Sequence, residues 1–163
     1  MKNNENNNRV NFEIDTTNYT FIGLRELPVN AIITVNGMFI YKGKYGYTPV
    51  LINKKQEILI SLPTHRAKKV SEILNNPDMV NQIKNNEICI IVDEYEKNGN
   101  TYKTCRFKNK HWLRMEEIQA EKEIEKELEN VIKIAKDIAF NNRKTQPATT
   151  EQNTENTEED LPF

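Results

Sequence analysis

Aromatic and basic side chains are interleaved in two parts of this chain, residues 39–55 and 102–114. Proteins that hold unpaired nucleic-acid strands use this mixture, because cations follow the phosphates while rings stack on bases at about 1–3 kcal/mol per base. Tyr45 and Tyr47 are favoured since they lie beside glycines and lysines, whereas Trp112 fits either base stacking or capping of the core. A strand tyrosine is more commonly half-buried packing. The candidate contact residues are Phe39, Tyr41, Lys42, Lys44, Tyr45, Tyr47, Lys54, Lys55, Lys103, Arg106, Lys108 and Trp112.

The residue patterns that support catalysis are missing from the sequence. It contains no glycine-rich phosphate loop, nucleophile elbow, paired-histidine metal motif or dinucleotide fingerprint. His65 stands at an expected helix start, where a capping or surface role is usual. Asp93 begins an acidic stretch before a turn, and a solvated hairpin end is the favoured role for that stretch. Cys89 and Cys105 have no zinc-ligand spacing to a histidine and are expected to stay reduced and buried. We therefore expect a protein that is not an enzyme and needs no metal or cofactor.

Most of the body is predicted to consist of β-strands. Runs rich in β-branched and aromatic residues lie at 31–41, 45–52, 57–62, 88–92 and 102–107. A helix beginning near Pro63 and a shorter one beginning at Pro77 separate the third strand from the fourth. This is the order of a five-stranded oligonucleotide-binding (OB) barrel. We therefore predict a mainly β fold, with this barrel formed by residues 19–113.

Glycines mark two positions where these strands must bend or turn. Gly37 lies in the middle of the first predicted strand, where it indicates a bulge or bend of the kind a small barrel requires. Asn98-Gly99 lies between the last two strands, and this dipeptide readily adopts the positive φ angles of a tight hairpin turn. The last two strands are therefore predicted to be antiparallel neighbours.

Segments 1–18, 114–142 and 143–163 lie outside the predicted barrel. The first is polar and asparagine-rich and is predicted to be a flexible arm, and the last is predicted to be a disordered acidic tail. The middle segment is predicted to be a long helix, because apolar residues recur in it every three or four positions. This seam must be buried, either on the barrel of the same chain or against a second copy. Its residues are Ile124, Leu128, Val131, Ala135 and Ile138.

The near-zero net charge of −1 conceals a strong asymmetry along the chain. Residues 9–114 contain 16 Lys and Arg against 10 Asp and Glu, whereas residues 145–163 contain 5 acidic residues and no basic one. A basic body indicates an anionic ligand, and an acidic tail would compete with that ligand for the same surface. No stretch of 18 apolar residues and no signal sequence is present, so we expect a cytoplasmic location and no membrane partner.

The chain ends in a run of carboxylates followed by an apolar tip, residues 158–163. A partner with an apolar pocket and a basic rim could bind the ring of Phe163 in the pocket and the free α-carboxylate at the rim. Pro162 limits the backbone freedom that would be lost when the tip docks. The candidate partner-binding residues are therefore Asp160, Leu161, Pro162 and Phe163.

This ending resembles the tip of bacterial single-stranded DNA-binding proteins, which end in Asp-Asp-Ile/Leu-Pro-Phe; Glu159 stands where an Asp is usual. The layout as a whole is nearest to members encoded by phages and plasmids. The resemblance implies an OB barrel that coats single-stranded DNA and a tip that recruits replication, recombination and repair proteins. This chain differs in its short tether and its additional helix, so the tetramer usual in that family is not implied.

Two other functions fit the same residues. A recombination mediator or strand-annealing protein would use the long helix to build an oligomer. A protein-only adaptor would bind a partner through its strand-rich body, and the tail would then be incidental.

Overall fold

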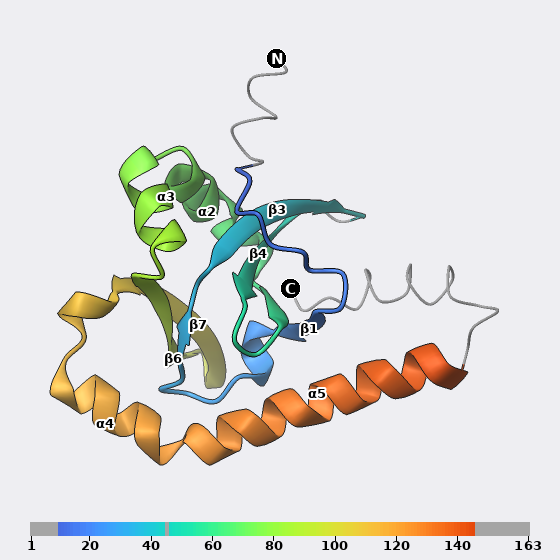
Figure 1. Cartoon of the computed structure of the whole chain (residues 1–163). Coiled ribbons are helices and arrows are strands. Elements are labelled where there is room, and N and C mark those ends of the chain that lie inside the picture. The colour runs from blue at the N-terminus through green and yellow to red at the C-terminus, as the bar shows by residue number, and fades with distance from the viewer. Residues whose placement is uncertain (1–9, 45, 146–163) are drawn as a thin grey trace.

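The computed structural model describes residues 10–44 and 46–145, and within them the fold is mixed α/β (Figure 1). The strands are β1 (Thr20–Gly23), β2 (Ile32–Thr34), β3 (Gly37–Gly43), β4 (Gly46–Asn53), β5 (Ile58–Ser61), β6 (Ile88–Lys97) and β7 (Asn100–Asn109). The α-helices are α2 (Ala67–Leu74), α3 (Pro77–Lys84), α4 (Met115–Glu123) and α5 (Glu125–Thr145), and the short 3-10 turns are η1 (Leu24–Glu26), η2 (Thr64–Arg66) and η3 (Lys110–Trp112).

The strands form two sheets, in the orders β1-β5-β4-β3 and β2-β6-β7. All neighbours are antiparallel except β1 and β5, which pair in parallel with Thr20 opposite Ile58. Across residues 10–44 and 46–145, no pairing joins β7 to β5, so the two sheets do not close into a barrel. The fold is thus mixed rather than mainly β, and the OB barrel stays a prediction.

The predicted strand 31–41 is divided between the two sheets. The chain leaves the second sheet after β2 and enters the first at β3, with Val35 and Asn36 between them. Val35 N–H donates to the carbonyl of Ile88 at 2.9 Å, and Asn36 N–H donates to the carbonyl of Ile52 at 2.8 Å. The bend expected at Gly37 therefore falls just before it. Glycine suits position 37 because an added Cβ would lie 3.0 Å from the Phe12 ring, which would then have to shift.

The helices predicted between the third and fourth strands are confirmed as α2 and α3. Asn76 begins α3, because its side-chain oxygen accepts from the backbone N–H of Asp78 at 3.0 Å, and Pro77 follows it in the first turn. Helix α2 buries Val70 and two other apolar residues on one face. Its opposite face is exposed to solvent.

The predicted Asn98-Gly99 turn is confirmed, with φ angles of 54° and 80° at the two residues. It joins β6 to β7, both of which extend to ten residues and are longer than the sequence pattern indicated. The polar residues after Val92 ended the predicted strand, but the backbone pairing continues beyond the core as far as Lys97 opposite Asn100.

The predicted C-terminal helix is two helices, because the backbone of Ile124 leaves helical geometry between α4 and α5. Figure 1 shows α5 running along one side of the body and continuing past it. Leu128 and Ile132 of α5 are buried in the main core, where α5 packs against β1. Ile124, Val131 and Ala135 are partly buried against the same core, whereas Ile138 is 56 % exposed, so the chain's own body covers the predicted seam except at its last residue.

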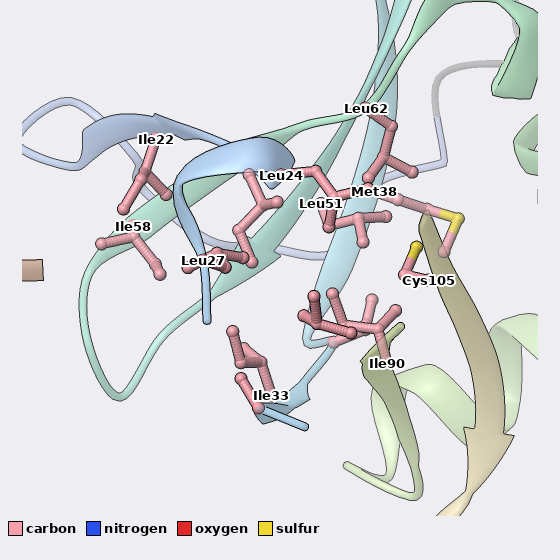
Figure 2. Packing of buried hydrophobic residues seen from close by; sticks show 14 of the residues in the cluster. Ile22, Leu24, Leu27, Ile33, Met38, Leu51, Ile58, Leu62, Ile90 and Cys105 are labelled. Carbon is pink, nitrogen blue, oxygen red and sulfur yellow. The ribbon is translucent and has the colours of Figure 1, made fainter. Parts of the chain in front are cut away.

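The main core lies between the sheets, and Figure 2 shows side chains from both sheets pointing into it. A second cluster, on the other face of the first sheet, contains Val50, Ile52 and Leu59. Ile14 and Tyr19, which precede β1, pack against this second cluster. Between residues 10 and 145, leaving out 45, no helix combines the length and apolar character needed to cross a bilayer.

Candidate nucleic-acid interface

The tip of the β3–β4 hairpin carries an exposed ring beside a cation. Lys42 and Tyr47 lie opposite each other across the hairpin, and Lys42 Nζ is 5.9 Å from the centre of the Tyr47 ring. The tyrosine is 56 % exposed. Lys44 is also exposed at the tip, whereas Tyr45 lies outside the described residues. An exposed ring next to positive charge has the properties needed to stack on a base while the cation contacts a phosphate.

Phe39 and Tyr41 point to the other face of the same hairpin. Successive residues of a strand alternate between faces, and β3 places Met38 and Ile40 toward the main core. Phe39 and Tyr41 are partly buried in the second cluster, which Ile14 and Tyr19 cover from the N-terminal side. The structure therefore uses these two rings for packing, on the face away from Tyr47.

Lys54 and Lys55 lie in the turn after β4, at the end of the sheet opposite the hairpin tip, and are exposed. Lys54 N–H donates to the side-chain oxygen of Asn36 at 2.8 Å, and the Asn36 amide donates to the side-chain oxygen of Asn86 at 2.7 Å. The next carbonyl, of Glu87, accepts from the N–H of Lys110 at 2.7 Å, at the start of η3.

These hydrogen bonds tie the 54–56 turn to the segment that carries Trp112, whose side chain is 74 % exposed. Candidate contact residues from two distant parts of the sequence, Lys54 and Lys55 in one and Trp112 in the other, are thereby brought to one end of the molecule. This end offers lysines and an exposed indole ring, a second place where base stacking and phosphate contact can coincide.

The three candidate cations of β7 are held by partners within the chain. Lys103 Nζ donates to the backbone carbonyl of Leu27. Arg106 pairs with Asp93 at 2.6 Å through Nε and with Glu117 at 3.4 Å through Nη1. Lys108 Nζ lies 2.9 Å from the Glu117 carboxylate. The charges of Arg106 and Lys108 are therefore neutralised internally, whereas the Lys103 ammonium is held against an uncharged carbonyl.

Glu117 is the centre of this neutralisation. Its carboxylate accepts from the backbone N–H of Arg114 at 2.8 Å as well as from Lys108. The Arg114 hydrogen bond is the main cause, and Lys108 the next, of a pKa of about 2 for Glu117, well below the ordinary value for a glutamate. The glutamate therefore stays ionised under all ordinary conditions.

One aromatic pair was not among the predicted contact residues. Tyr95 and Tyr102 face each other across the β6–β7 hairpin, with ring centres 5.5 Å apart and each side chain nearly half exposed. Tyr95 lies beyond the predicted end of its strand, so its pairing was not foreseen. The pairing could have been predicted from the sequence, because counting back residue by residue from the Asn98-Gly99 turn places these two rings opposite each other.

Cys89 and Cys105 are both buried free thiols, and burial raises the pKa of each to about 11. The strand register separates them, because Cys89 lies opposite Lys108 and Cys105 lies opposite Val92. In the part of the chain that the structure describes, no three His, Cys, Asp or Glu side chains gather as metal ligands. The predicted partner-binding residues Asp160, Leu161, Pro162 and Phe163 lie outside that part.

Comparison of the chain with protein-family models, curated proteins and solved structures found no match. The case for a function therefore depends on the chain's own residues.

Proposed function

We propose that this protein binds single-stranded DNA without strong sequence preference. The observation that carries the proposal is the exposed Tyr47 ring with Lys42 beside it at the tip of a hairpin. This arrangement can stack on any base, because every base has a π face, while the charge contacts the phosphate next to it. The excess of 16 basic over 10 acidic residues in the segment 9–114 gives the body the charge that such a ligand requires.

The second end of the molecule supports the same function. Lys54, Lys55 and Trp112 provide a further ring with cations, linked to each other through Asn36 and Asn86. A single strand that contacts both ends would span the length of β4 over the elements that cover it, because Thr48 to Asn53 are all buried. This path does not depend on the neutralised cations of β7.

We further propose that the two sheets are an opened form of the OB barrel. The order β3-β4-β5, then helices, then β6-β7 supports this, and so does the antiparallel pairing of β2 with β6. In such a barrel the segment 32–43 acts as one bent strand shared by both sheets. β1 occupies the edge of β5 at which the barrel would otherwise close.

The C-terminal tip is proposed to recruit replication, recombination or repair proteins through Asp160, Leu161, Pro162 and Phe163. The support is the sequence of the tip and its resemblance to single-stranded DNA-binding proteins. Deletion of Phe163 is expected to abolish capture of such proteins, identified by mass spectrometry, while affinity for DNA is kept. Asn156→Ala, upstream of the tip, is the matched control. Unchanged capture after the deletion would remove the tip from the proposal.

The binding proposal is tested by titrating the full chain with oligo(dT) and with duplex DNA at low and high salt. The chain has one tryptophan, so quenching of Trp112 fluorescence reports directly on the second end. We expect oligo(dT) to bind, duplex to bind more weakly, and affinity to fall steeply with salt because phosphate contacts release counterions. Absence of oligo(dT) binding at low salt, measured by fluorescence anisotropy of labelled DNA, contradicts the proposal and favours a protein-only adaptor.

A strand-annealing or recombination-mediator role is the second candidate, and α5 is the observation that favours it. Ile134 and Ile138, four residues apart on α5, are about half exposed. Pairing of this face with a second copy would build the oligomer that such a role requires. Light scattering that shows large assemblies, together with annealing of complementary strands, would favour this candidate over a simple coat.

A further inference from the structure

A cavity of about 580 Å³ opens between the α2–α3 pair and strand β7. Its volume is in the range of small-molecule sites and large enough for a single nucleotide. None of its lining residues belongs to either ring-and-cation site described above. Its lining residues are Arg66, Lys69, Glu72, Ile73, Asn76, Met79, Cys105, Arg106 and Phe107.

One wall of the cavity is the open edge of β7. Val92 directs its N–H and carbonyl to the β2 side, where they bond to Ala31 and Asn30, so the backbone groups of Cys105 opposite it point away from β6. Phe107, two residues further on, is oriented in the same way. The edge therefore presents backbone donors and acceptors to the cavity, the type of group that can bond to the edge of a base.

Positive charge is fixed at the mouth of the cavity. Arg66 donates from Nη2 to the Cys105 carbonyl at 2.7 Å, which holds its guanidinium against β7. Its Nε is buried and, among the described residues, has no hydrogen-bond partner. Lys69, one turn further along, is exposed and adds a second cation, against the single carboxylate of Glu72, while the third cation of the lining, Arg106, is paired with Asp93. An anionic ligand is favoured by this balance.

The interior of the cavity is apolar. Ile73 is buried on α2, and Met79 and Phe107 are partly buried on α3 and β7. A flat hydrophobic ring fits between such side chains, and the flexible thioether of Met79 adapts to its shape. The ligand that matches cations outside and apolar walls inside is a nucleotide, with its phosphate at the mouth and its base within.

The cavity adjoins the proposed DNA path. Helix α2 packs against β3 and β4, the two strands that carry Lys42 and Tyr47 at their hairpin tip. The η2 turn that ends at Arg66 also contacts β4. Because Val70 of α2 is in the main core, this helix lies on the same face of the hairpin as Lys42 and Tyr47.

We propose that this cavity accepts one unstacked nucleotide of the bound strand, with its phosphate at Arg66 and Lys69 and its base against Met79 and Phe107. The inference rests on the proposed single-strand binding and adds a specific recognition pocket to it. It assigns Lys69 a phosphate contact that its neighbour Lys68, exposed on the same helix but outside the cavity lining, does not make.

The test compares Lys69→Ala with Lys68→Ala in the full chain, using oligo(dT) at several salt concentrations. Lys69→Ala is expected to lower the slope of log affinity against log salt by about 0.7, the loss of one single-strand phosphate contact. Lys68→Ala is expected to match the wild type. Thermal unfolding of both variants should be alike, because both lysines are exposed. In parallel, titration with oligo(dT) is expected to shift the backbone amide NMR signals of Cys105 and Phe107.

The possible outcomes separate this inference from the proposed function. If the wild type binds oligo(dT) but the Cys105 and Phe107 amides do not shift and the two lysine variants bind alike, the inference is wrong and the proposed function stands. If no oligonucleotide binds, both fail. If an acidic peptide shifts these amides and oligo(dT) does not, the cavity is a peptide site and the inference is overturned.

Discussion

The Glu117 carboxylate lies 2.9 Å from Lys108 Nζ and 3.4 Å from Arg106 Nη1, so that the first turn of α4 supplies negative charge to two cations of β7. Its side chain is only 8 % exposed, which limits the screening of these ion pairs by solvent. Glu117 thereby fixes the position of α4, and through it the start of α5, on the second sheet. Because Arg106 also pairs with Asp93 at 2.6 Å, substitution of Glu117 tests its contacts with Lys108 and Arg106 and leaves the Asp93 pair in place.

Glu117→Gln is expected to destabilise the protein at neutral pH by about 1–3 kcal/mol, because it removes charged hydrogen bonds. The folded pKa of about 2 lies below the ordinary value of 4.5, so the stabilisation is full above the ordinary value and is lost as the pH falls toward 2. The stability difference between variant and wild type should therefore shrink in acid. Urea unfolding at neutral and acidic pH measures this, with exposed Glu116→Gln as control. A difference that is independent of pH would contradict the assignment.

Tyr47→Ala is expected to lower affinity for oligo(dT) by about 5- to 150-fold, which corresponds to the loss of about 1–3 kcal/mol of stacking on one base. Stability should change by no more than about 0.5 kcal/mol, because the ring is mostly exposed. Phe21→Ala, which removes an exposed ring from β1, is the control in the same anisotropy measurement. Equal effects of the two substitutions on affinity would argue against a specific role for Tyr47.

Cys89 and Cys105 are expected not to react with a thiol reagent in the folded protein at mildly alkaline pH. Burial raises the pKa of each to about 11, so the thiolate is scarce, and the buried sulfur is out of reach of the reagent. Both should react once the protein is unfolded in denaturant, which absorbance of the released reagent group will count. Rapid reaction of either thiol in the native protein would show that its strand is not packed as described.

Leu128→Ala is expected to cost about 2–5 kcal/mol of unfolding free energy, because it opens a cavity under α5. Ile138→Ala should change stability by no more than about 0.5 kcal/mol if α5 packs only on its own body. The comparison is made by urea unfolding at two protein concentrations. A large, concentration-dependent effect of Ile138→Ala would show instead that a second copy covers this part of α5.

The elements with local signals were predictable from the sequence. The Asn98-Gly99 turn and the start of α3 at Asn76-Pro77 are determined by residues adjacent in the chain. The division of the first predicted strand was not predictable, because it depends on two different partners, Ile88 and Ile52, for consecutive residues. β1 was missed for a similar reason, since four residues have little pattern of their own and are held by parallel pairing with β5.

The same distinction applies to the candidate site. Strand alternation separates Phe39 and Tyr41 from Met38 and Ile40 on the opposite face, so this part of the arrangement follows from the sequence. That Ile14 and Tyr19 cover those two rings follows from the path of the N-terminal segment, which no local pattern reveals. The partner of Lys103 is the carbonyl of Leu27, 76 positions away in sequence. Availability of a cation for a ligand is thus a property of tertiary structure.

The junction at Val35 and Asn36 couples the two sheets during unfolding. Since Val35 bonds to β6 and Asn36 bonds to β4, breaking either sheet removes a constraint from the other. Unfolding of either sheet alone would displace these two residues and so break a hydrogen bond to the other sheet. We therefore expect the body to unfold as one cooperative unit, with the slowest-exchanging amides of β4 and β6 sharing a common opening free energy despite lying in different sheets.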